Sequence, residues 1–124
     1  MNNWKNSNFI DALKASINGI KIVFTNERNF KIQLVFGILA IIAGIVLKIS
    51  LQEFAIIAIS IFIVFISEFF NTAIENVLDM VSLEYNEKTK MAKDVAAGAV
   101  TFSAILSIII GIIIFLPKII EIIK

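Results

Sequence analysis

The sequence predicts an all-α integral membrane protein with one amphipathic helix at the membrane surface and three transmembrane helices. Hydrophobic residues make up 59% of the 124 residues, and the mean hydropathy is +0.94, well above that of an ordinary globular domain. The charged residues, 17% of the chain, are almost absent from three long stretches rich in Ile, Leu, Val and Phe. A chain of this length holds one membrane domain, residues 1–124.

The segment 8–26 has the pattern of an amphipathic helix. On a helical wheel, its apolar side chains share one arc about 100° wide, and lysines and other polar residues fill the adjacent arc. The segment is too short and too polar to span a bilayer, so we expect it to lie in the interface. No apolar run precedes Phe30, and we therefore expect the first span to stay in the membrane as an anchor.

Three apolar stretches follow this segment. The first, 30–47, is near the minimum length for a bilayer core. The second, 51–66, has a helical pattern that continues to about residue 81 without proline or glycine. We therefore expect its last turns to project into the interface. After a polar connection over 82–93, the third span covers 95–116, and Pro117 is predicted to end it.

Basic residues are distributed unequally over the two sides of the membrane. The N-terminal segment through Lys31 and the connection 82–93 carry eight of them, whereas the opposite side carries three, Lys48, Lys118 and Lys124. Positive charge is enriched in cytoplasmic segments. We therefore expect a multi-pass plasma-membrane protein with its N-terminus and the 82–93 connection in the cytoplasm.

The chain contains no cysteine and no histidine. This excludes a disulfide framework, a thiol nucleophile and a thiolate metal site, together with the commonest zinc ligand and the usual general base. Any catalysis must therefore use carboxylates, for which Mg²⁺ is the fitting metal. A net charge of +1 without a basic stripe argues against a nucleic-acid partner.

Three carboxylates lie on one face of the second long helix. Glu68, Glu75 and Asp79 fall within about 40° of one another on a helical wheel, flanked by Asn71 and Thr72. Glu68 adjoins the apolar stretch, where an ionisable side chain is costly and indicates function. Spacing alone leaves two other interpretations open: hydrogen bonds between helices of a non-enzymatic assembly, or a proton or cation pathway.

Lys93 and Asp94 open the third long helix. Helix-terminal N–H groups and a lysine can together hold a phosphate group. The sequence contains no Walker A motif and no kinase Gly-rich loop, so a nucleotide site here would differ from the familiar kinds.

Three sequence blocks resemble the prokaryotic diacylglycerol kinase family, the small trimeric membrane lipid kinases. The segment Glu68–Asp79, EFFNTAIENVLD, matches the family pattern E-x-x-N-[ST]-A-I-E-x-x-x-D. Asn26–Phe30 and Ala92–Val100 match two further blocks in the same order, so the resemblance covers nearly the whole chain. It implies transfer of the γ-phosphate of Mg-ATP to a lipid hydroxyl, in a homotrimer whose sites lie between neighbouring protomers.

The resemblance also implies a role for each matched residue. Glu68 falls on the catalytic base and Asn71 on a catalytic residue beside it, while Glu27 and Glu75 fall on the metal-binding carboxylates. The expected nucleotide-binding residues are Glu27, Glu75, Asp79, Glu84, Tyr85, Asn86, Lys93 and Asp94. The expected lipid-binding residues are Glu68 and Ala97. Mg²⁺ is the expected cofactor, with ATP as co-substrate.

Three positions depart from residues common in the family. Asn86 stands where histidine is frequent, Gln33 where some members have a carboxylate, and Ala15 where some have an aromatic residue. These departures affect the nucleotide site more than the base. The versions of Asn26–Phe30 and Asp94–Val100 resemble the Gram-positive branch, whose members phosphorylate undecaprenol. We therefore expect undecaprenol as the acceptor, with diacylglycerol as the alternative.

Overall fold

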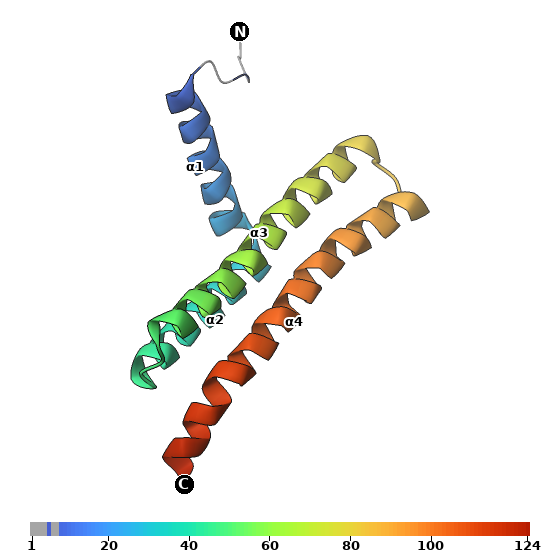
Figure 1. Cartoon of the computed structure of the whole chain (residues 1–124). Coiled ribbons are helices and arrows are strands. Elements are labelled where there is room, and N and C mark those ends of the chain that lie inside the picture. The colour runs from blue at the N-terminus through green and yellow to red at the C-terminus, as the bar shows by residue number, and fades with distance from the viewer. Residues whose placement is uncertain (1–4, 6–7) are drawn as a thin grey trace.

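The computed structural model describes residue 5 and residues 8–124, and four helices make up this part of the chain. They are α1 (Phe9–Asn26), α2 (Arg28–Val46), α3 (Leu51–Val81) and α4 (Glu87–Ile123). The helices α3 and α4 form a long antiparallel hairpin, α2 packs against α3, and α1 leaves the bundle at a steep angle (Figure 1). Helices α2, α3 and α4 are each long and apolar enough to cross a membrane. The predicted all-helical membrane fold is confirmed.

Helix α1 presents its apolar face outward. The Asn8 side chain caps its first turn by accepting a hydrogen bond from the Asp11 N–H at 2.9 Å. Phe9 is 79% exposed, and Val23 is the one buried residue of this helix. An apolar face that stays mostly exposed in the described part of the chain fits a helix that lies in the membrane surface. The helix ends at Asn26, and one residue in an extended conformation, Glu27, joins it to α2.

The turn between α2 and α3 is tight. Lys48 has a φ of 52°, in the left-handed region that non-glycine residues rarely adopt. Ser50 and Glu53 form a capping box at the start of α3, in which each side chain accepts a hydrogen bond from the other residue's backbone N–H. Such a box satisfies N–H groups that the first helical turn leaves unpaired. The turn therefore fixes where α3 begins.

Gly44 lets α2 approach this turn closely, and its replacement tests that packing. A Cβ at position 44 would lie 2.7 Å from Cε1 of the Phe54 ring and 2.9 Å from Cδ1 of Ile49. Gly44→Ala should therefore destabilise the protein by about 1–3 kcal/mol through overpacking. Thermal unfolding in detergent, followed by circular dichroism, measures the change.

Gly19→Ala is the matched control for this experiment. A Cβ at position 19 would meet nothing within 4 Å, so this variant should unfold at the wild-type temperature or slightly above it, because alanine favours the helix. An unchanged midpoint for Gly44→Ala would contradict the close approach described here.

Small residues let α3 and α4 pack closely, and a hydrogen bond joins the two helices within the apolar part of the hairpin. The Ser107 hydroxyl of α4 donates to the Ser60 carbonyl oxygen of α3 at 3.2 Å, and Ser60 is buried. Small side chains let two membrane helices approach closely. The 31 residues of α3 extend about 46 Å at 1.5 Å per residue, whereas a hydrocarbon core is roughly 30 Å thick. The last turns of α3 are therefore long enough to project beyond the hydrocarbon.

The ends of α4 differ from the prediction. Its first turn begins at Glu87, because the Asn86 side chain accepts hydrogen bonds from the Lys88 and Thr89 N–H groups. The polar connection is therefore 82–86, rather than 82–93. The prediction that Pro117 ends the helix was wrong, since Pro117 lies inside α4. Proline lacks one backbone donor, and membrane helices tolerate this loss where neighbouring groups and local adjustments compensate.

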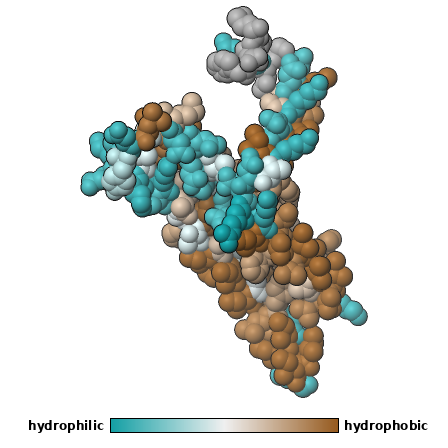
Figure 2. All heavy atoms as spheres, turned by 180° about the vertical axis from the view of Figure 1, so that it is seen from behind, coloured by the Kyte–Doolittle hydropathy of each residue, from teal (hydrophilic) through white to brown (hydrophobic). Residues whose placement is uncertain are grey.

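Hydrophilic atoms gather at one end of the molecule. On the face that Figure 2 shows, they cover the α3–α4 connection and one side of α1, whereas apolar side chains cover most of the remaining visible surface. In the most apolar windows of α2, α3 and α4, 17%, 22% and 6% of the residues are buried within the chain. A surface this apolar requires lipid or other apolar protein surface as its environment. The polar end is where the candidate site residues lie.

Candidate functional site

Glu68 of α3 is buried, with 1% of its surface exposed. The Gln33 amide of α2 donates a hydrogen bond from Nε2 to Glu68 Oε1 at 3.0 Å. The other oxygen, Oε2, is also buried, and no hydrogen-bond donor in the described part of the chain reaches it. Because a buried polar atom without a partner costs free energy, this oxygen is available to a partner beyond the described residues.

Asn71, Thr72 and Glu75 extend the site along the same face of α3. Residues three, four and seven positions apart share one helical face. Asn71 Nδ2 donates to Glu75 Oε1 at 3.3 Å, while Asn71 Oδ1 and Thr72 Oγ1 are buried and unpartnered in the described residues. Glu75 is partly exposed. Along this face, the side chains are therefore buried at Glu68 and partly exposed at Glu75, which is the open end of the site.

Glu27 approaches this face from the junction of α1 and α2. It adopts an extended conformation, and its side chain makes no capping hydrogen bond to α2. Glu27 and Glu75 are both near enough to Glu68 for their charges to act on it. The structure thus places near one another the three glutamates for which the family resemblance implies roles as base and metal ligands.

An aromatic cluster holds this junction against α3. The Phe30 ring is 1% exposed, and its centroid lies 4.6 Å from that of Phe24, 4.8 Å from Phe65 and 5.6 Å from Phe69. These rings come from α1, α2 and α3. Tilted ring pairs at such distances are favourable contacts. Phe30 therefore fixes the position of Glu27 three residues before it.

Glu27 and Glu75 are the carboxylates that the family resemblance assigns to Mg²⁺. The residues that the structure describes contain no group of three or more acidic side chains able to enclose an ion by themselves. Magnesium is usually held by one or two carboxylates together with substrate phosphates and water. A Mg²⁺ ion held by Glu27 and Glu75 together with nucleotide phosphates therefore stays a prediction.

A second group of predicted residues lies at the far end of the α3–α4 hairpin. Lys93 Nζ of α4 pairs with Asp79 Oδ1 of α3 at 2.6 Å, and Lys90 Nζ contacts both Asp94 oxygens, at 2.8 and 2.7 Å. The connection places three exposed residues nearby, Glu84, Tyr85 and Asn86. Asp79 is eleven residues beyond Glu68, about 16 Å along a helix. Within one chain, the predicted nucleotide-binding residues are therefore spread along the hairpin.

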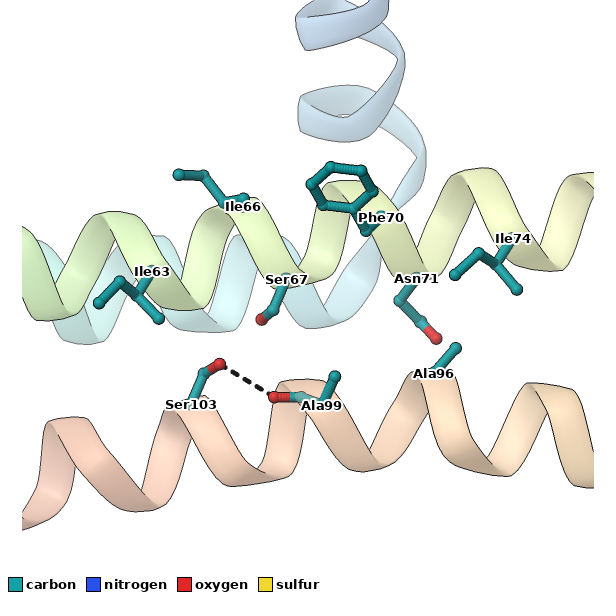
Figure 3. A pocket seen from close by; sticks show the side chains of 9 residues that line it. All are labelled: Ile63, Ile66, Ser67, Phe70, Asn71, Ile74, Ala96, Ala99 and Ser103. Carbon is teal, nitrogen blue, oxygen red and sulfur yellow. Dashed lines mark hydrogen bonds between the residues drawn. The ribbon is translucent and has the colours of Figure 1, made fainter.

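A cleft of about 400 Å³ separates α3 from α4 beside Asn71. Figure 3 shows Asn71 pointing toward Ala96 across this cleft, with Ile63, Ile66 and Phe70 along the α3 side. Ala97, the expected lipid contact, is exposed and does not line the cleft. The neighbouring residue Ala96, which is buried, lines the cleft instead. A lipid contact at Ala97 stays a prediction.

Sequence reasoning treated Gln33 as a departure that affects the nucleotide site more than the base, and Thr72 only as a neighbour of the carboxylates, whereas the structure places Gln33 against Glu68. Gln33 is the one polar side chain in the apolar run 32–47, and Thr72 lies one helical turn from Glu68. A polar side chain at membrane depth indicates a partner inside the bundle. This signal could have marked Gln33, but it does not identify Glu68 as the partner.

Comparisons with known proteins agree on one family. The sequence profile described as prokaryotic diacylglycerol kinase matches residues 14–115. The undecaprenol kinase of Bacillus subtilis is 40% identical over 100 residues, which are 81% of each chain. A diacylglycerol kinase of Synechocystis is 35% identical over 115 residues, 92% of this chain and 66% of that protein. The diacylglycerol kinase of Escherichia coli is 31% identical over 100 residues, 81% of this chain and 82% of its own.

The matched region contains every residue of the site described above. It includes the Glu27 junction, the face of α3 from Glu68 to Asp79, and the first turns of α4. These elements combine a buried carboxylate with an apolar, membrane-spanning surface. The chain therefore belongs to the prokaryotic diacylglycerol kinase family of multi-pass membrane proteins and is an ATP-dependent lipid kinase.

Proposed function

We propose that this lipid kinase phosphorylates undecaprenol and that Glu68 is its general base. The observation that carries the role of Glu68 is its buried, unpartnered Oε2. The undecaprenol kinase of Bacillus subtilis, at 40% identity, supports undecaprenol as the acceptor. The diacylglycerol kinase of Synechocystis, at 35% identity, makes diacylglycerol the second candidate.

In the proposed reaction, Glu68 accepts the proton of the lipid hydroxyl. The hydroxyl oxygen forms a bond to the γ-phosphorus of ATP, the bond from that phosphorus to the bridging oxygen breaks, and ADP leaves. Phosphoryl transfer depends mainly on positioning and on charge stabilisation. We assign Asn71 a positioning role beside Glu75, to which its amide donates a hydrogen bond.

Glu27 and Glu75 would hold Mg²⁺. The ion would neutralise charge on the nucleotide phosphates. We assign the rest of the nucleotide site to the far end of the hairpin, with Lys93 offering a positive charge to phosphate. That group comprises Asp79, Glu84, Tyr85, Asn86, Lys93 and Asp94. In this proposal the polar end faces the cytoplasm, as the excess of basic residues at that end favours.

The proposed active unit is a homotrimer with sites between protomers. Two observations support it. The nucleotide-binding candidates and Glu68 are spread over about 16 Å of α3 in one chain, so a second chain can supply the part that is missing near Glu68. A Cβ at Gly98 or Gly111 of α4 would meet nothing within 4 Å, which leaves room for another helix to approach.

A side-by-side kinase assay tests the acceptor. Purified protein in lipid or detergent receives Mg²⁺, labelled ATP and either undecaprenol or diacylglycerol. We expect kcat/KM for undecaprenol to exceed that for diacylglycerol by at least about tenfold, within the range that apolar recognition provides. A preference for diacylglycerol would identify it as the acceptor instead. Turnover on neither lipid would contradict the proposed function.

A further inference from the structure

Gln33 is the one side chain in the described part of the chain that donates a hydrogen bond to the Glu68 carboxylate. We propose that Gln33 is a positioning residue, which holds Glu68 Oε1 so that Oε2 is the oxygen presented to the lipid hydroxyl. This inference rests on the proposed role of Glu68 as the base. It adds a residue of α2 to a site otherwise formed on α3.

The two oxygens of Glu68 are chemically equivalent until the structure distinguishes them. Gln33 Nε2 donates to Oε1 at 3.0 Å from a helix 35 positions away in the chain, and Oε2 remains without a donor. The last torsion of a glutamate side chain is broad, so a hydrogen bond from another helix is needed to fix the plane of the carboxylate. The Gln33 amide supplies this constraint.

Gln33 also lies where an apolar groove meets the buried base. The groove has a volume of about 420 Å³ between α2, α3 and α4, and its lining includes Phe36, Gly37, Val64 and Phe65. Gln33 is its polar residue on α2. Movement of this side chain would therefore change the orientation of Glu68 directly, next to apolar surface that a lipid tail can contact.

An amide and a carboxylate at this position would hold Glu68 in different ways. An amide has N–H donors for Glu68, whereas an ionised carboxylate has none. A glutamate at position 33 would face Glu68 with a second negative charge, and two such groups tend to share one proton. Gln33→Glu therefore changes few atoms and little volume, but it replaces a permanent N–H donor by a group that can donate only while the pair of carboxyl groups holds a proton.

The test compares Gln33→Leu and Gln33→Glu with wild type in the undecaprenol assay. Both variants should lower kcat by about 10–100-fold through misplacement of the base, with the KM for ATP within about twofold of wild type. Gln52→Leu is the matched control, because Gln52 is exposed in the first turn of α3, far along the helix from Glu68. It should retain the wild-type kcat.

A double-mutant cycle separates positioning from damage to the fold. In a Glu68→Gln background, Gln33→Leu should lower the residual rate by less than about twofold, because the group that it positions is gone. A structural defect would instead lower the rate equally in both backgrounds and raise the KM for ATP, which would overturn the inference. The near-isosteric Gln33→Glu gives the same comparison if Gln33→Leu fails to fold.

The inference and the proposed function fail in different ways. A wild-type kcat in both Gln33 variants, together with an inactive Glu68→Gln, would overturn the role of Gln33 and leave the base assignment standing. An active Glu68→Gln would overturn the base assignment itself, and the positioning role with it.

Discussion

Glu68→Gln should lower kcat by about 10²–10⁴-fold, the range that general base catalysis contributes. The amide keeps the shape of the side chain but cannot take the proton of the lipid hydroxyl. Its carbonyl oxygen can still accept the hydrogen bond that Gln33 Nε2 donates to Oε1 in the native protein. We therefore expect the fold and the KM for ATP to be retained. Steady-state kinetics with undecaprenol measure the effect, and circular dichroism in detergent confirms the helices.

Glu121→Gln is the control for the loss of a glutamate charge. Glu121 is exposed in the last turn of α4, at the end of the hairpin opposite the site. This variant should keep the wild-type rate. If Glu68→Gln also kept a rate near that of wild type, another group would have to accept the proton.

Removing both proposed metal ligands should have an effect of similar size. Glu27→Gln/Glu75→Gln is expected to lower activity at a fixed, limiting Mg²⁺ concentration by about 10²–10⁴-fold, if each loss weakens metal binding by 10–100-fold. The amides keep the volume of the side chains, and Asn71 Nδ2 retains an acceptor at position 75. Activity measured as a function of Mg²⁺ concentration gives the midpoint for wild type, each single variant and the double variant.

The magnesium dependence distinguishes a metal ligand from a base. Excess Mg²⁺ should restore much of the activity of the single Glu75→Gln variant, whereas it should not restore Glu68→Gln. A Mg²⁺ midpoint equal to that of wild type in both single variants would contradict the assignment of Glu27 and Glu75. The same assays test whether the two carboxylates act together, since independent losses multiply.

The sequence predicts the helices better than it predicts their ends. The pattern of α3 continues from Leu51 to Val81 without a breaker, and the structure has that helix over the same residues. The start of α4 was placed too late because its first turns are polar. Asn86 caps them and Lys90 pairs with Asp94 one turn on, local interactions that stabilise a polar helix end. Hydropathy, which identified the spans, does not report such interactions.

For the site, too, the sequence predicts which residues share one helix face better than it predicts contacts between different helices. Helical periodicity placed Glu68 and Glu75 on one face, and family resemblance added Glu27. Periodicity alone left a non-enzymatic assembly or an ion pathway open, and family membership decides for the enzyme. The contact between Gln33 and Glu68 depends on how α2 is rotated against α3, which packing around Phe30 determines. The rotation of α2 against α3 cannot be deduced from a single sequence.

Much of the molecular surface is apolar and faces outward. This property determines how the rate of the enzyme depends on its lipid acceptor. Since α4 has 6% of its most apolar window buried within the chain, a bilayer surrounds the enzyme and dissolves its acceptor at the same time. The lipid reaches the protein by lateral diffusion in two dimensions, so its effective concentration is a mole fraction of the membrane. Diluting the acceptor with inert lipid therefore slows the enzyme even when the amount of acceptor per volume of suspension is constant.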